Sequence, residues 1–291
     1  MRLIPFHRPS LALTCALGAV VCTAAWLLPS PARADDAPPA SALTTTANVA
    51  LVSQYKFRGI DQTWGRAAIQ GGVDLADASG LYAGAWASNV SGNSYPGGSL
   101  ELDLYAGYNG KIGDDLGYTV GGYGYVYPGA NFDRSACGSA AYAAPCALPD
   151  KRLDTLEFNA GISWRWLAYK LSVSAGDYFG AAASTGYDGS TRGTLYHDLS
   201  VTWPVSDSLS LVAHVGHTDV KARYAGVNAD YTDYRLALTQ TFAGGWNAGA
   251  SVAGAGNDRF YRPPAGGLSL ANGDRRAVNR TAFIVQAGRT F

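Results

Sequence analysis

The chain has 291 residues, with 22 basic and 22 acidic side chains, and only 15% of its residues are charged. Zero net charge and so few charged groups remove the electrostatic basis for binding nucleic acid. Beyond the N-terminal segment, no apolar run approaches the roughly 20 residues that a membrane-spanning helix needs.

Residues 1–34 have the features of a bacterial secretory signal peptide. A basic start precedes an apolar run from Leu11 to Leu28, and an A-x-A cleavage motif ends at Ala34. A membrane-anchoring helix is the weaker alternative, because prolines close the run before the cleavage motif. We therefore expect export through the Sec pathway, cleavage after Ala34, and a short N-terminal periplasmic segment over 35–46.

The rest of the chain, residues 47–291, alternates apolar and polar side chains with the period of a β-strand. This pattern predicts about twelve strands, near 47–58, 66–76, 80–89, 98–109, 115–127, 153–165, 168–179, 194–204, 208–218, 230–243, 245–256 and 278–291. Helical amphipathicity is nowhere sustained, so the fold class is all-β.

The connections between these predicted strands alternate strictly between short and long. The even connections are tight, as at Asp77–Gly80 and Val205–Asp207, whereas the odd ones are long, as at Pro128–Arg152. Outer-membrane barrels have short periplasmic turns and long extracellular loops in this order, and a soluble sandwich has no reason to keep it. We predict a transmembrane, antiparallel, up-and-down β-barrel of about 12 strands with both termini in the periplasm.

The two faces of the predicted strands fit this barrel. In the strand near 153–165, Leu156 and Phe158 share one parity and Glu157 shares the other. Apolar side chains would face lipid and polar ones a wet lumen. The same rule, applied to the strand near 47–58, predicts that Tyr55 and Phe57 face lipid.

After removal of the signal peptide only two cysteines remain, Cys137 and Cys146, in the third long connection. Two cysteines in an exported chain, with no histidine nearby, indicate one disulfide that closes a small loop and not a metal site. This loop could fold into the pore or cover its mouth, and the sequence does not choose between them.

The stretches NVALVSQYKFRGIDQTWGRAAIQGG, GLYAGAWASNVS and YPGGSLELDLYAGY, within residues 48–108, resemble the hallmark segments of a known family. This is the Gcw_chp family of conserved hypothetical proteins, also called the TorF family of porins. Outside these segments the resemblance is limited to strand layout and the terminal Phe291. The resemblance implies an outer-membrane channel of unknown substrate.

Lumen charges would set the selectivity of such a channel. Strand parity places two groups of charges at a similar height in the outer half of the lumen. The first is a basic arc from the first, second and last strands: Lys56, Arg58, Arg66 and Arg280. The second is an acidic wall: Glu101, Asp103, Glu157 and Asp198. We hypothesise that they face each other and create a transverse field, the alternative being that they pair as neighbours to fill the barrel.

The sequence favours an enzyme less than a channel. His197 and His217 are expected on the lipid side near the outer rim, with Asp177 close by, where a lipid-hydrolysing barrel would place its catalytic residues. No serine shares that face and height, and no nucleophile motif is present. Ordinary interface histidines explain the pattern better.

The sequence thus predicts an outer-membrane porin for passive diffusion of small hydrophilic solutes, with no cofactor, metal or catalytic residue. Its expected partners are outer-membrane lipid, those solutes and the barrel-assembly machinery, which would read the final strand ending at Phe291. The sequence does not decide whether the barrel forms a homo-oligomer. The main alternative is a closed barrel that acts as a surface adhesion or structural protein.

Overall fold

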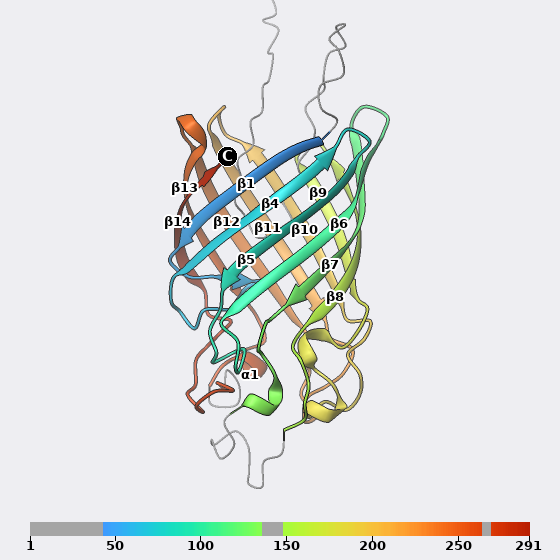
Figure 1. The fold of residues 1–291 in the computed structure, drawn as a ribbon, viewed down its shortest axis with the longest axis vertical. Coiled ribbons are helices and arrows are strands. Elements are labelled where there is room, and N and C mark those ends of the chain that lie inside the picture. The colour runs from blue at the N-terminus through green and yellow to red at the C-terminus, as the bar shows by residue number, and fades with distance from the viewer. Residues whose placement is uncertain (1–42, 136–147, 264–268) are drawn as a thin grey trace, which may run out of the picture.

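The computed structural model describes residues 43–135, 148–263 and 269–291, and in these ranges twelve antiparallel strands form a closed barrel (Figure 1). Each barrel strand pairs with the next in the chain, and β1 closes the barrel by pairing with β14. The barrel strands are β1 (Leu43–Val52), β4 (Ala68–Asp77), β5 (Leu81–Asn89), β6 (Leu100–Ile112), β7 (Leu116–Val126), β8 (Thr155–Trp164), β9 (Leu167–Ser174), β10 (Leu195–Pro204), β11 (Leu209–Asp219), β12 (Tyr231–Thr241), β13 (Trp246–Ala255) and β14 (Ala282–Thr290).

Helices are few and short in the described ranges. They are α1 (Asp258–Tyr261) and four single 3₁₀ turns, Phe132–Arg134, Tyr178–Gly180, Ala183–Thr185 and Ala243–Gly245. Of the helices described, none has the length and apolar character to cross a membrane.

The wall has an apolar outer face and a polar inner face, as predicted. On β8, Phe158 and Ile162 are 55% and 53% exposed, whereas Glu157 and Ser163 are 2% and 5% exposed. The same arrangement, opposite to that of a soluble protein, holds around the barrel: large apolar side chains are exposed and polar ones are buried. A continuous exposed apolar belt requires hydrocarbon around it, which confirms the predicted transmembrane barrel.

The two ends of the barrel differ in the length of their connections, also as predicted. Short turns join β4 to β5, β6 to β7, β8 to β9, β10 to β11 and β12 to β13. They lie at the end shown at the top of Figure 1, near the C-terminus, and the long connections lie at the opposite end. We call these the short-turn end and the long-loop end.

The first strand differs from its prediction, and the difference decides what fills the barrel. β1 starts at Leu43, inside the predicted periplasmic segment, and ends at Val52 instead of continuing to residue 58. Beyond it the chain turns inward and forms a small hairpin of β2 (Lys56–Phe57) and β3 (Ile60–Asp61). The prediction that Tyr55 and Phe57 face lipid is therefore wrong. Period-two alternation is the same in a wall strand and in a hairpin, so parity alone could not separate them.

The apolar core lies inside the barrel, towards the long-loop end. Tyr55 is 3% exposed and its ring contacts that of Trp86 at 5.6 Å between centroids. Phe57 packs against Tyr125 at 5.3 Å. The inward hairpin thus supplies aromatic side chains to a core that barrel strands and long loops complete.

Candidate functional site in the barrel lumen

The inward hairpin is held in place by its turn and by its lysine. Arg58 and Gly59 form the turn, with φ values of 46° and 75°. A Cβ atom on Gly59 would lie 2.5 Å from the carbonyl oxygen of Gly254, so the approach to β13 requires glycine. The Lys56 Nζ donates hydrogen bonds to the carbonyl oxygens of Gly59 and Val278, at 3.0 and 3.1 Å. Burial lowers the pKa of Lys56 to about 8, against the opposing charge of Asp61.

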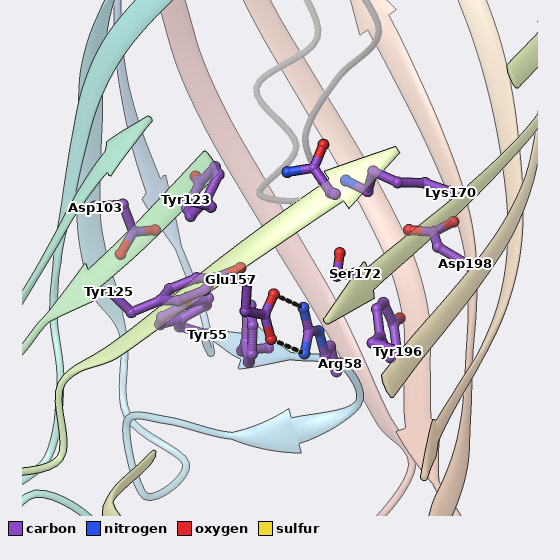
Figure 2. A pocket seen from close by; sticks show the side chains of 12 residues that line it. Tyr55, Arg58, Asp103, Tyr123, Tyr125, Glu157, Lys170, Ser172, Tyr196 and Asp198 are labelled. Atoms are coloured by element: carbon purple, nitrogen blue, oxygen red, sulfur yellow. Dashed lines mark hydrogen bonds and ion pairs between the residues drawn. The ribbon is translucent and has the colours of Figure 1, made fainter. Parts of the chain in front are cut away.

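Arg58 crosses the lumen and pairs with the barrel wall (Figure 2). Its Nη1 and Nη2 atoms donate to Glu157 Oε1 and Oε2 at 2.9 and 2.6 Å, and both side chains are almost fully buried. The guanidinium carbon lies 3.9 Å from the ring centroid of Tyr196, and Nη1 also donates to the Tyr178 hydroxyl at 3.1 Å. A bidentate, ring-stacked pair of this kind fixes the hairpin across the barrel.

A cavity lies beside this ion pair, towards the short-turn end (Figure 2). Its empty volume is about 560 Å³, including solvent that opens into it. In Figure 2, Asp103 and Tyr123 lie on one side, Lys170 and Asp198 on the other, and Arg58 lies below them. Phe57 and Arg58 of the hairpin form part of its lining.

The four residues of the predicted acidic wall all point into the barrel. Glu101, Asp103 and Glu157 are at most 2% exposed, and Asp198 is 8% exposed. Their surroundings differ. Glu157 pairs with Arg58, whereas Glu101 accepts a hydrogen bond from the Tyr127 hydroxyl at 2.9 Å.

The predicted basic arc is not assembled as expected. Lys56 and Arg58 lie inside the barrel, but on the hairpin instead of the wall. Arg66 and Arg280 lie outside the barrel strands and are exposed. Arg58 contacts Glu157 directly, so at this height positive and negative charges are paired and not separated by the lumen.

A buried histidine was missed by the sequence reasoning. The His214 Nδ1 lies 3.2 Å from Asp198 Oδ1 and its Nε2 lies 2.9 Å from Asp233 Oδ1. Ser200 donates to Asp198 at 2.6 Å. The parity rule places His214 inside the barrel, together with Gly216 and Thr218, and could have found it. The sequence reasoning also missed Lys170, which the parity rule places inside the barrel together with Ser172.

The two rim histidines lie opposite each other on β10 and β11, on the outer face of the barrel. His197 Nδ1 lies 2.8 Å from the Tyr169 hydroxyl, and His217 Nδ1 lies 2.9 Å from Thr232 Oγ1. Asp177 instead binds Lys151 at 2.7 Å. The three residues considered for a hydrolase therefore have separate partners.

Asp177 belongs to the network that ties the long loops together. It accepts hydrogen bonds from Lys151 Nζ and, at 2.6 Å, from Ser190 Oγ. Burial acts in the opposite direction, but these hydrogen bonds and the Lys151 charge lower the pKa of Asp177 below its ordinary value.

Three remaining expectations concern metals, cysteines and the C-terminus. In the described part of the chain, no group of three or more His, Cys, Asp or Glu side chains could hold a metal ion. Cys137 and Cys146 lie outside the described residues, as does the signal peptide 1–34. The backbone of Phe291 pairs with that of Ala47, its N–H donating to the carbonyl oxygen at 2.8 Å, and its side chain is exposed at the short-turn end. Its role in assembly stays a prediction.

The fold and the lumen define a class of protein, a transmembrane β-barrel whose charged interior is partly filled by the inward hairpin. The chain belongs to the Gcw_chp family, described as bacterial protein of unknown function, whose model matches residues 36–291. This confirms the resemblance seen in residues 48–108.

Comparison with curated proteins finds no match. Several solved barrels are similar in outline. A KdgM porin has a TM-score of 0.46 at 7% identity, with 84% of this chain and 98% of that chain covered. A NanC porin has a TM-score of 0.47 at 10% identity, with 85% of this chain and 99% of that chain covered. OccAB3 from Acinetobacter baumannii has a TM-score of 0.40 at 10% identity, with 86% of this chain and 65% of that chain covered. At these values the function must be argued from the residues of this chain.

Proposed function

We propose that this protein is an outer-membrane channel through which small hydrophilic solutes diffuse, and that the inward hairpin sets the width of its lumen. The observation that carries the proposal is the charged lumen inside an apolar-belted barrel. Lys170, Asp198 and Arg58 line a cavity in the barrel interior, where a purely structural barrel would gain more from apolar packing. Passive diffusion needs no cofactor and no catalytic residue.

The predicted signal peptide and the arrangement of short and long connections support the location. A barrel exported through the Sec pathway would place its short-turn end in the periplasm and its long loops outside the cell. The cavity would then open towards the periplasm, and the hairpin would lie between it and the extracellular loops.

One observation favours the second candidate, a closed barrel that serves as a surface adhesion or structural protein. Tyr95 and Tyr127 stack at 4.1 Å beneath the long loops, and the Tyr95 hydroxyl donates to Gln62 beside the hairpin. This buried layer narrows the path from the long-loop end. Conduction therefore has to be measured.

The test is single-channel conductance of the refolded mature chain in a planar bilayer. The matched variant replaces residues 54–66, which hold the hairpin, by a short Gly/Ser link that leaves β1 and β4 intact. We expect discrete openings of the unmodified protein and larger ones of the variant. If both chains fold, as judged by heat-modifiable gel migration, and neither conducts, the channel is refuted in favour of the closed barrel.

A further inference from the structure

The cavity beside the hairpin has a negative side without a protein cation. Asp103 is 2% exposed, and its Oδ1 atom makes no hydrogen bond within the described part of the chain. Glu101, two residues earlier on the same inward face, is fully buried, and its Oε2 atom is likewise unpartnered among described residues. Neither carboxyl group forms an ion pair with a described side chain. Of the two, only Asp103 is among the residues that line the cavity, and a buried carboxylate without an ion pair favours a bound cation there.

Aromatic rings border the same side. The rings of Tyr123 and Tyr125 both line the cavity, 4.8 Å apart between centroids, and the Tyr123 hydroxyl is a hydrogen-bond partner of Asp103. Tyr105 stacks behind Tyr123 at 4.9 Å and holds that ring in place. The negative faces of such rings attract ammonium groups, so carboxylate and rings together suit an organic cation better than a bare metal ion.

The opposite side of the cavity holds the register partners Lys170 on β9 and Asp198 on β10. Lys170 reaches into it from β9, and its ammonium group makes no hydrogen bond or ion pair with any residue that the structure describes. The nearby Asp198 is already engaged by His214 and Ser200. The Arg58 charge is balanced by Glu157. Lys170 is thus the cation at this cavity that stays available to an anion.

We propose that the cavity binds a small linear amino-carboxylate, with its ammonium group at Asp103 beside the rings of Tyr123 and Tyr125 and its carboxylate at Lys170. The inference rests on the proposed channel, whose solute class it names. A simple anion would leave the carboxyl side without a partner, and a simple cation would leave Lys170 without one. A neutral sugar would leave both charges unpaired, which costs more than its hydrogen bonds return.

Binding is measured separately from conduction, by calorimetry of the refolded barrel in detergent. The probes are ω-amino acids of increasing length, from glycine to 6-aminohexanoate, with butyrate and butylammonium as singly charged references. Because the two charged sides are fixed by the wall, affinity should peak at one chain length. That probe should bind about tenfold or more tightly than either reference, as expected when each pole adds a charge-assisted hydrogen bond.

Two variants test which side of the cavity binds each charged group of the amino acid. Asp103→Asn should weaken the best amino acid and butylammonium but leave butyrate unchanged, and Lys170→Met should weaken the amino acid and butyrate only. Asp219→Asn is the matched control, since Asp219 lies outside this cavity and its carboxylate pairs with Lys221 at 3.8 Å.

The inference is overturned if affinity does not depend on length, or if the amino acids bind no better than butyrate and butylammonium. Conductance of the same preparation separates the two proposals. A conducting barrel without this binding leaves the channel standing and removes the solute class. A binding barrel that does not conduct leaves the site and removes the channel.

Discussion

Glu157→Gln should release the inward hairpin and open the lumen. In the native protein Glu157 receives two hydrogen bonds from Arg58, at 2.9 and 2.6 Å, and the two side chains are 2% and 6% exposed. The glutamine keeps the size of the side chain but leaves the guanidinium buried without a counter-charge. The cation–π contact with Tyr196 remains, but it cannot replace the lost carboxylate.

The size of the effect follows from the burial of the pair. Removing one partner of a buried ion pair costs about 3–5 kcal/mol. Each 1.4 kcal/mol changes an equilibrium constant about tenfold, so the population with the hairpin displaced should rise by roughly 10²- to 4 × 10³-fold. Single-channel recording should show this as a larger open fraction or a larger conductance.

A matched control separates this effect from a general loss of charge. Lys221 and Asp219 form an exposed pair, with an N–O distance of 3.8 Å and side chains 45% and 44% exposed. Asp219→Asn should change little, because exposed pairs contribute at most about 1 kcal/mol. The charge-swapped double variant Arg58→Glu/Glu157→Arg should restore part of the native behaviour. A folded Glu157→Gln barrel with native conductance and native open fraction would refute the role of the pair in holding the hairpin.

Three further outcomes are expected. Gly59→Ala should lower the melting temperature and raise conductance, because φ of 75° costs an L-residue about 1–2 kcal/mol and the new Cβ would clash with Gly254; native values of both would contradict the turn geometry. The lowered pKa of Asp177 means that its carboxylate stabilises the long loops above the ordinary pKa near 4 and that this is lost as pH falls through the lowered value. Protease cleavage of the loops should therefore rise on acidification in the native chain and be high at every pH in Asp177→Asn, and identical acid profiles would contradict this. Phe158→Arg should cost about 2–4 kcal/mol of folding free energy in a bilayer, and Asn159→Arg in the lumen much less; equal costs would contradict the assignment of the two faces.

The amino-acid sequence determined the barrel because both of its signals are local. Alternation along β8, with Leu156 and Phe158 on one parity and Glu157 on the other, records which face meets lipid. Connection lengths record which end each turn belongs to. Neither signal depends on what lies across the lumen, so strand number, order and inward-facing residues could be predicted.

The path of the chain after Val52 could not be predicted in this way. Tyr55, Lys56 and Phe57 continue the alternation of β1, but they belong to a hairpin inside the barrel. Only the closed wall shows that there is room for it and that Gly59 can approach Gly254.

The partners of the lumen charges were likewise decided by the tertiary structure. Arg58 and Glu157 are 99 residues apart in the chain, and His214 reaches Asp198 and Asp233 on two different strands. Parity states that such side chains point inward but not which of them meet, because barrel closure and strand stagger set distances across the lumen. The sequence by itself therefore determined a membrane barrel with a charged interior. The tertiary structure decided which charges neutralise one another. It also decided that Asp103 and Lys170 face the cavity without an ion pair to any described side chain.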